Sequence, residues 1–342
     1  MRVFVLLFAV SAVITGGLRG LFVRLGLMDL PNARSSHAVP VPRGGGLAIV
    51  ATFLSAVVWV LQRRLISDRL AWALIGGGLA IAVVGFLDDR FRLPAWPRIA
   101  IHSLASAWAV WCVDAMPSAH FSGDSDVWGW ARRCAEVVAL VWLTNLFNFM
   151  DGIDGLAGVE AVCVSGLGAV LLLRGGLPDV VLLSSMLAAA SLGFLVWNWP
   201  PAKIFMGDVG SGFLGFTLGT LALFSSRADS KLIWTWLILL AIFFVDATVT
   251  LLHRMILHAR WHEAHRSHAY QHAAQTYGSH AKVTLAAAVI DVGWLFPLAW
   301  AALRYPQAAI KLAAIAFAPL IYLAFRFEAG REWPLPKLAS QD

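Results

Sequence analysis

The sequence predicts an all-α, polytopic integral membrane protein with about eleven transmembrane helices. Of the 342 residues, 59% are hydrophobic and only 13% are charged, which is about half the charge that a soluble domain carries. Apolar runs of roughly 17–25 residues recur along the chain, each long enough to cross a bilayer core. A soluble fold could not hide that much apolar surface, so we expect one polytopic domain over residues 1–342.

The first apolar run follows Arg2 and ends near Thr15. It resembles a signal peptide. The alternative interpretation is an uncleaved first helix over about 3–21. We favour the helix, because the segment that follows needs an anchor on a particular side of the membrane. The ten further helices are expected, in order, at 45–61, 70–87, 99–116, 134–149, 157–173, 179–197, 211–225, 232–252, 283–303 and 308–325.

The helix expected at 211–225 carries Gly215 and Gly219 at a spacing of four, with Gly212 a further turn back. Small residues at this spacing let neighbouring membrane helices approach closely. We therefore expect this helix to pack tightly against others.

The segments between helices alternate in character, and five of them hold nearly all the Asp, Asn, His and Gly-rich patterns. With eleven helices, these five and the C-terminus emerge on one side, which predicts one active site there. A modest excess of Lys and Arg places that side in the cytoplasm, and the N-terminus in the periplasm. The five segments are 22–44, 88–98, 145–156, 198–210 and 253–282.

The net charge of +6 does not indicate nucleic-acid binding, because the basic residues are scattered in short loops between apolar runs. That distribution is typical of membrane topology and of anionic lipid head groups. The three cysteines form neither a CxxC pair nor a zinc spacing. We expect them to be packing residues.

Two adjacent carboxylates, Asp88 and Asp89, close a predicted helix. Such a pair at a membrane boundary can hold a cation or accept a proton, since like charges raise one pKa. The alternative is a helix end with solvated charges.

Asn145, Asn148, Asp151 and Asp154 recur every three residues. That spacing stacks them near one face at a helix end. Amides and carboxylates together suit a nucleotide base and a hydrated Mg²⁺. A structural cap followed by glycine turns is the alternative interpretation.

Asp208 is flanked by glycines and opens a Gly-rich helix, which resembles a metal ligand on a tight turn, or else a helix cap. Phe205, just before it, could stack on a base. Arg43 precedes three glycines that allow a phosphate to approach the backbone.

Histidines and arginines alternate in the segment 253–282. Histidine-rich tracts can bind zinc, but cationic His and Arg suit pyrophosphate equally well. The metalloprotease motif HExxH is absent, because His262 and His265 are one residue too close.

These motifs, taken in order, closely resemble those of the polyprenyl-phosphate N-acetylhexosamine-1-phosphate transferases. The resemblance covers about residues 29 to 272 and is nearest to the branch that initiates O-antigen and other lipid-linked glycans. Phospho-N-acetylmuramoyl-pentapeptide transferase is a sibling. The motifs are PRGGG at 42–46, DDxxR at 88–92, NxxNxxDGIDGLAG at 145–158, FMGDVGS at 205–211 and the late histidine segment.

The resemblance implies transfer of N-acetylhexosamine-1-phosphate from a UDP-sugar to undecaprenyl phosphate, with release of UMP. It also implies Mg²⁺ as cofactor, with Mn²⁺ able to substitute, a homodimer, and a bacterial inner-membrane location with the site facing the cytoplasm. The implied catalytic residues are Asp88, Asp89, Asp151 and Asp154, and the implied metal ligands are Asp208 and Asp151. The implied substrate-binding residues are Arg43, Arg92, Asn145, Asn148, Asn198, Phe205, His265, Arg266, His268 and His272.

Two positions depart from the family pattern. Arg92 stands where the family often has Lys, and an Arg still binds phosphate, in bidentate fashion. The late segment lacks a consecutive histidine cluster, which suggests a distinct sugar and argues against a pentapeptide-bearing substrate.

The rival hypothesis is a transporter of a nucleotide-sugar or another anionic substrate. Transporters place polar groups near the bilayer midplane, whereas these motifs lie at loop boundaries. Asp246, inside a predicted helix, is the one residue that the transport hypothesis favours, and we expect it to line the floor of the active site.

Overall fold

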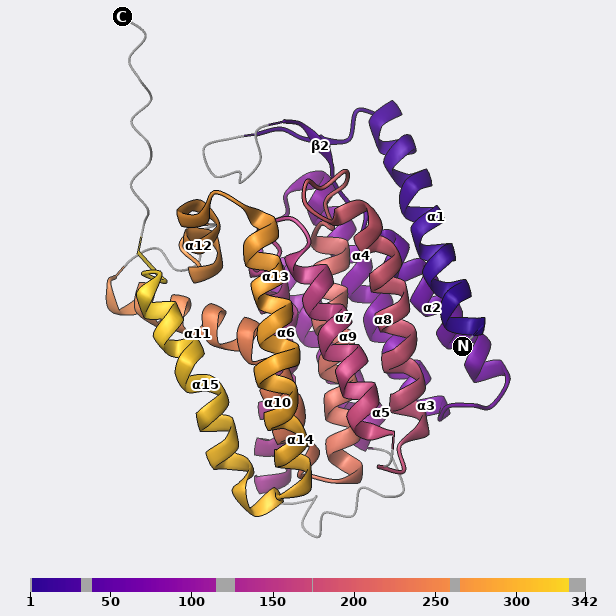
Figure 1. Cartoon of the computed structure of the whole chain (residues 1–342). Coiled ribbons are helices and arrows are strands. Elements are labelled where there is room, and N and C mark those ends of the chain that lie inside the picture. Colours follow the sequence, from indigo (N-terminus) through magenta and orange to yellow (C-terminus); the bar gives the residue numbers. More distant parts are fainter. Residues whose placement is uncertain (1, 32–38, 115–126, 174, 259–264, 332–342) are drawn as a thin grey trace, which may run out of the picture.

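The computed structural model describes residues 2–31, 39–114, 127–173, 175–258 and 265–331, and helices dominate it (Figure 1). Parts of two predicted loops, 32–38 and 259–264, lie outside the described residues. The elements are α1 (Arg2–Arg24), β1 (Met28–Asp29), β2 (Val41–Pro42), α2 (Leu47–Gln62), α3 (Asp68–Trp72), the π-helix η1 (Ala73–Gly77), α4 (Gly78–Phe91), α5 (Ala95–Asp114), α6 (Val127–Phe149), α7 (Leu156–Leu172), α8 (Pro178–Asn198), α9 (Asp208–Ala228), α10 (Leu232–Leu239), α11 (Ala241–Ile256), α12 (Ala269–Tyr277), α13 (His280–Ile290), the π-helix η2 (Asp291–Leu295), α14 (Phe296–Arg304), the 3₁₀-helix η3 (Pro306–Ala308) and α15 (Ala309–Arg326).

Each predicted helical range falls on a helical segment of the structure. In the described chain, six helices are long and apolar enough to cross a membrane, or up to seven if the bent pair α10 and α11 forms one span. The protein is therefore a multi-pass membrane protein. The number of eleven spans and the sides on which the termini lie stay predictions.

Helix α9 lies at the centre of the bundle, with α4 and α6 against it. A Cβ atom added at Gly215 would lie 2.3 Å from the backbone oxygen of Leu143 on α6, and one at Gly219 would lie 2.7 Å from the side chain of Leu140. These glycines therefore permit the close helix contact that the sequence predicted.

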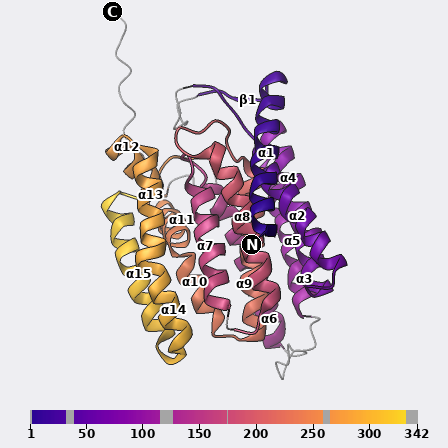
Figure 2. The ribbon, with the colours of Figure 1, turned by 45° about the vertical axis from the view of Figure 1, so that its right-hand side comes forward.

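The remaining helices flank this centre. Figures 1 and 2 both show α1 and α2 on one side of the bundle and α13, α14 and α15 on the other. In both views α12 and the short β1–β2 ribbon lie at the same end of the bundle. This end carries the candidate site.

The structure corrects three details of the predicted elements. The range 232–252 is not one helix but two, α10 and α11. Their axes differ in direction by 72°, and the break lies at Leu240. Helix α4 continues through both aspartates to Phe91, so the loop that was predicted to begin at 88 begins four residues later, at Arg92. Neither the helix α12, which lies inside the predicted loop 253–282, nor the two short antiparallel strands β1 and β2 were predicted.

Two acidic side chains, Glu160 on α7 and Asp291 on η2, are buried together inside the bundle, 0% and 1% exposed. The two carboxyl groups are close enough to influence each other's charge. Within the described chain, none of their side-chain oxygens has a hydrogen-bond partner, and neither side chain forms an ion pair with a basic residue. Because two adjacent ionised carboxylates repel strongly in an apolar interior, we expect one of the two to carry a proton.

Candidate active site

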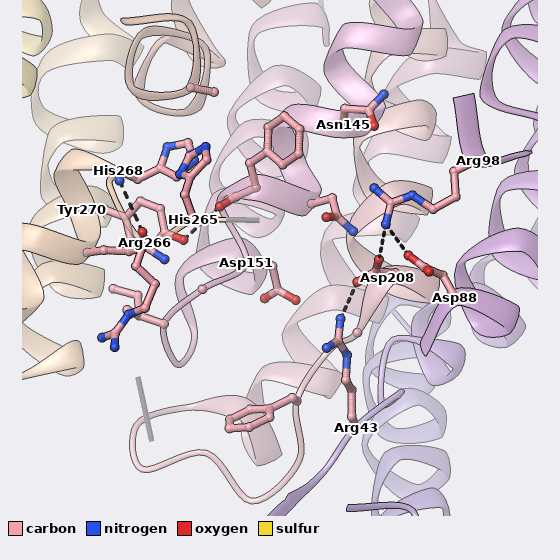
Figure 3. Close-up of a pocket in the computed structure, with 18 of the residues that line it drawn as sticks. Arg43, Asp88, Arg98, Asn145, Asp151, Asp208, His265, Arg266, His268 and Tyr270 are labelled. Atoms are coloured by element: carbon pink, nitrogen blue, oxygen red, sulfur yellow. Dashed lines mark hydrogen bonds and ion pairs between the residues drawn. The ribbon is translucent and has the colours of Figure 1, made fainter. Parts of the chain in front are cut away.

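The five segments that the sequence singled out meet at one cavity of about 970 Å³ at the end of the bundle. Its walls combine carboxylates, guanidinium groups, amides and imidazoles with exposed apolar side chains of α5 and α6 (Figure 3). Each segment contributes at least one polar side chain. The contributing side chains include Arg43, Asp88, Asn148, Asp208 and His268.

Asp208 is the first residue of α9 and follows Gly207, whose φ of +77° suits a glycine. Its Oδ1 atom lies 2.5 Å from Nη2 of Arg43, and its Oδ2 atom lies 3.6 Å from Nη1 of Arg98. Arg98 also forms an ion pair with Asp88 (Figure 3). The predicted metal ligand is therefore held between two guanidinium groups.

The two aspartates of α4 have different surroundings. Asp88 lines the cavity, where it pairs with Arg98 and accepts the backbone N–H of Leu93 at 2.6 Å. Asp89 does not line the cavity. Its carboxylate accepts the backbone N–H groups of Asp208 and Val209, at 2.9 and 3.1 Å, and pairs with Nε of Arg43 at 2.7 Å.

Asn145 and Asn148 lie on the last turns of α6, and both line the cavity. The Asn145 side chain donates to the backbone oxygen of Val141 one turn back, at 2.7 Å. Asn148 donates to the hydroxyl of Ser211 on α9, at 3.4 Å. The predicted one-sided stacking is thus observed, and it ties α6 to the beginning of α9.

Asp151 follows the end of α6 and lies between the histidine segment and Asp208 (Figure 3). Among the described residues, its side chain has no hydrogen-bond or ion-pair partner. Burial raises the pKa of Asp151 well above its usual value, and the carboxylates of Asp208 and Asp89 add to this effect against the influence of Arg43. A cation beside this side chain would favour its ionised form.

Asp154 and Asn198 line the cavity but are engaged with the backbone around it. Asp154 accepts the N–H of Ala202 at 3.0 Å. The Asn198 amide accepts from the N–H of Gly155 at 3.1 Å and donates to the backbone oxygen of Ile204 at 3.0 Å. These contacts give Asn198 a role in shaping the loop that ends in Phe205.

The histidine segment is anchored by Asp246 on α11. Its carboxylate accepts the backbone N–H groups of Ala269 and Tyr270, at 3.1 and 2.9 Å, and faces Nδ1 of His268 at 3.1 Å. Asp246 therefore caps α12 and orients the ring of His268, and it does not lie at the floor of the cavity. A carboxylate that accepts hydrogen bonds from the N-terminal N–H groups of a helix stabilises that helix.

His265, Arg266 and His268 line the cavity. Burial, with His268 and Arg254 nearby, lowers the pKa of His265 to about 3, so this ring is neutral at physiological pH. His272 does not line the cavity: it is 1% exposed, and its Nδ1 atom lies 2.6 Å from the backbone oxygen of Phe327. Its position indicates a structural role between α12 and the end of α15.

Sequence reasoning missed several side chains of the cavity wall. Arg98 lies in the first turn of α5, ten residues after Asp88. The sequence feature that could have identified it is its position as a basic residue at the end of the predicted loop 88–98. Tyr270 donates to the backbone oxygen of Phe149 at 2.9 Å, which ties α12 to the end of α6. The other unpredicted polar side chains of the wall are Asp29, Gln271 and His280.

Comparison with known proteins identifies the family. The chain is 33% identical, over 71% of its length and 68% of the relative's, to a Bacillus subtilis protein named undecaprenyl-phosphate N-acetylglucosaminyl 1-phosphate transferase. The chain belongs to glycosyl transferase family 4. The model of that family matches residues 71–226.

Two further relatives match most of the chain. The chain is 30% identical, over 79% of its length and 74% of the relative's, to a decaprenyl-phosphate N-acetylglucosaminephosphotransferase of Mycobacterium tuberculosis. It is 28% identical, over 65% of its length and 75% of the relative's, to a phospho-N-acetylmuramoyl-pentapeptide-transferase of Geobacillus thermodenitrificans. The names of the Bacillus and Mycobacterium relatives describe transferases that act on a polyprenyl phosphate. The family 4 match includes Asp88 and Asp208, whereas Arg43 and the histidine segment lie outside it.

The cavity offers a family 4 enzyme a set of oxygen ligands for Mg²⁺. Asp208 and Asp151 face the same space, and carboxylate oxygens are the ligands that Mg²⁺ prefers. In the present side-chain arrangement of the described residues, no group of three or more His, Cys, Asp and Glu side chains could hold a metal ion. The donor chemistry fits Mg²⁺, but Arg43 and Arg98 face the oxygens of Asp208.

Proposed function

We propose that this chain transfers N-acetylhexosamine-1-phosphate from a UDP-sugar to undecaprenyl phosphate and thereby initiates a lipid-linked glycan, as in O-antigen or cell-wall polysaccharide synthesis. The observation that carries the proposal is the placement of Asp208, Asp151 and Asp88 with four arginines at one cavity of a multi-pass membrane protein. That set suits two phosphate groups and a cation. The names of the family 4 relatives support the same reaction.

In this reaction an oxygen of the carrier phosphate attacks the sugar-bound phosphorus of the UDP-sugar. The bond from that phosphorus to the oxygen bridging the diphosphate breaks, and UMP leaves with that oxygen. Attack of one phosphate on another is limited by charge repulsion and alignment more than by covalent chemistry. The protein therefore has to neutralise and orient two anions.

The residues of the cavity divide this task between its two ends. Arg98 and Arg92 line the cavity with Asp88 and would bind the carrier phosphate. Phe205 lines the cavity and would stack on uracil, while Asn198 supports its loop. Arg266 and His268, at the far end of the cavity, would contact the sugar or its diphosphate.

Asp208 and Asp151 would hold Mg²⁺, with Asn148 beside them. When bound, the ion would offset charge on the diphosphate. The contacts of Asp89 with the backbone of Asp208 favour a positioning role for Asp89 and leave Asp88 as the carboxylate that faces the carrier phosphate.

The carrier's chain would lie along apolar side chains next to the cavity. Ile99 on α5 and Val138 on α6 line the cavity and are 51% and 66% exposed. Such side chains suit contact with lipid. The resemblance and the positive-inside pattern support a cavity that faces the cytoplasm of the bacterial inner membrane.

The test uses purified full-length protein in detergent with undecaprenyl phosphate and a panel of UDP-N-acetylhexosamines, following UMP release with and without Mg²⁺. We expect UMP from one donor, dependent on both lipid and Mg²⁺. If folded protein releases no UMP from any donor but carries a nucleotide-sugar into liposomes, the transporter hypothesis replaces this one.

A further inference from the structure

Arg43 lies among four carboxylates at the candidate metal site. Its Nη2 atom is 2.5 Å from Asp208, its Nε atom is 2.7 Å from Asp89, and its Nη1 atom is 3.9 Å from Asp29. Asp151 is the fourth acidic neighbour. Burial alone would lower the pKa of Arg43, but these carboxylates outweigh burial and raise it, so the guanidinium group is permanently charged.

The backbone on either side of Arg43 is fixed to the loop that presents Asp208. Arg43 forms a parallel bridge with Phe205, and the N–H groups of Gly44 and Gly45 both donate to the backbone oxygen of Phe205. The N–H of Gly46 donates to the backbone oxygen of Met206 at 2.9 Å. Arg43 can therefore change its contacts only by turning its side chain.

The Arg43 side chain has room to turn, since it is 40% exposed and lines the cavity (Figure 3). Arg98, the other cation near Asp208, is only 26% exposed, lies 3.6 Å from Asp208 and is held by Asp88. Of the two arginines, Arg43 has the shorter contact with Asp208 and the more exposed side chain.

A cation bound at Oδ1 of Asp208 would compete with the present contact of Arg43 with the same atom. Mg²⁺ binds carboxylate oxygens at about 2.1 Å and Arg43 lies 2.5 Å from that oxygen, so the ion and the guanidinium nitrogen would lie at most about 4.6 Å apart, where two positive charges repel. Conversely, an empty site without Arg43 would leave adjacent carboxylates unneutralised.

We propose that Arg43 is an exchangeable cation. It neutralises Asp208 while no metal is bound, and it turns from Asp208 onto the diphosphate of the substrate when Mg²⁺ enters. This inference rests on the proposed function, because it takes Asp208 as a metal ligand. The exchange replaces the single positive charge of Arg43 at Asp208 with the two charges of Mg²⁺, and it delivers Arg43 to the substrate only when both metal and diphosphate are present.

The experiment measures binding of Mn²⁺ alone, by electron paramagnetic resonance, to purified full-length protein without substrate. Arg43→Gln removes the competing charge, so it should bind Mn²⁺ at least about tenfold more tightly than the wild type, while its turnover falls. Arg43→Lys should lie between them, since an ammonium group cannot bridge Asp208 and Asp89 as a guanidinium group does. Arg331→Gln is the control for net charge, because Arg331 is exposed and lies outside the cavity.

The outcomes separate the two proposals. If the wild type binds Mn²⁺ and both Arg43 variants, shown to be folded by thermal unfolding, bind it equally or more weakly, the exchange is wrong and the metal site stands. If neither the wild type nor either variant binds Mn²⁺, and Asp208→Asn makes no difference, both the exchange and the metal site fail. Tighter binding in Arg331→Gln as well would attribute the gain to net charge and overturn the exchange.

Discussion

The carboxylate of Asp89 holds the backbone of Asp208: one oxygen accepts the N–H of Asp208 at 2.9 Å, and the other accepts the N–H of Val209 at 3.1 Å. The first N–H groups of a helix have no partner within it, and here a residue from the end of α4 supplies the acceptors. The two adjacent aspartates of α4 therefore have different roles. Asp88 faces the cavity, whereas Asp89 fixes the position of the next carboxylate.

Asp89→Ala is expected to destabilise the protein by about 1–3 kcal/mol, because two backbone donors and Arg43 lose their acceptor. The half-saturating Mg²⁺ concentration should also rise, since Asp208 is less well placed. Thermal unfolding in detergent and a Mg²⁺ titration of UMP release measure the two effects. Asp68→Ala, at the start of α3 and outside the cavity, should change neither quantity; equal effects in both variants would contradict the positioning role.

Asp208→Asn should lower turnover by at least about 10³-fold, since the charge that holds Mg²⁺ is lost. The variant should remain folded, because the amide keeps the shape of the side chain. Steady-state UMP release, with the unfolding midpoint as a check on folding, measures this. Activity like that of the wild type would remove Asp208 from the metal site.

Asp246→Asn should weaken the N-terminal cap of α12 and loosen His268, at a cost of about 0.5–2 kcal/mol. The KM for the UDP-sugar should rise more than kcat falls if the histidine segment contacts the sugar. Thr250→Val is the matched control, because Thr250 contacts the same carboxylate at 3.1 Å but does not touch α12 through that bond. An effect of the same size in Thr250→Val would show that the carboxylate's role lies within α11.

His265 should remain neutral down to mildly acidic pH. Its pKa is lowered to about 3 in the folded protein, below the ordinary value of about 6.5 that applies when it is unfolded. Its contribution to stability is therefore complete above about pH 6.5 and is lost as the pH falls from there toward 3. Histidine NMR titration of the wild type against His265→Asn checks this, and a resonance lost in the variant that titrates near pH 6.5 would refute it.

The stability of the protein should tolerate replacement of one carboxyl group of the Glu160–Asp291 pair by an uncharged amide. Glu160→Gln keeps a donor for Asp291 and should change stability by less than about 1 kcal/mol, whereas Glu160→Leu leaves Asp291 without its partner and should cost about 1–3 kcal/mol. The double replacement of both residues by Leu should recover most of that loss, since it removes both polar groups. Thermal unfolding ranks the variants; a Glu160→Gln protein as unstable as Glu160→Leu would exclude the shared proton.

Local patterns in the sequence were sufficient to predict the long apolar helical segments and the five segments that meet at the cavity, but not the helix α12 inside one of them. Long apolar runs predict the helices, and the regular three-residue spacing of Asn145, Asn148 and Asp151 identifies them as candidate site residues. The break at Leu240 could not be predicted, because neither Pro nor Gly marks it. The predicted single helix therefore missed the bend.

The roles of individual polar residues were harder to predict, because they depend on contacts between segments far apart in the chain. His272 matched a substrate-binding position but packs against Phe327. Asn198 matched a base-binding position but supports the backbone of its own loop. Arg98 carried no motif, and only the packing of α5 beside α4 brings it to Asp88.

The contact between Arg43 and Asp208 joins residues 165 positions apart, and this separation has a consequence for biosynthesis. At about 5–20 residues per second, a ribosome needs roughly 10 to 30 s to make the intervening chain. Throughout that interval the Gly44–Gly46 backbone lacks the Phe205 and Met206 oxygens that later fix it. The Arg43–Asp208 part of the candidate active site is therefore a late product of membrane insertion, because it cannot form before the central helix α9 has been made.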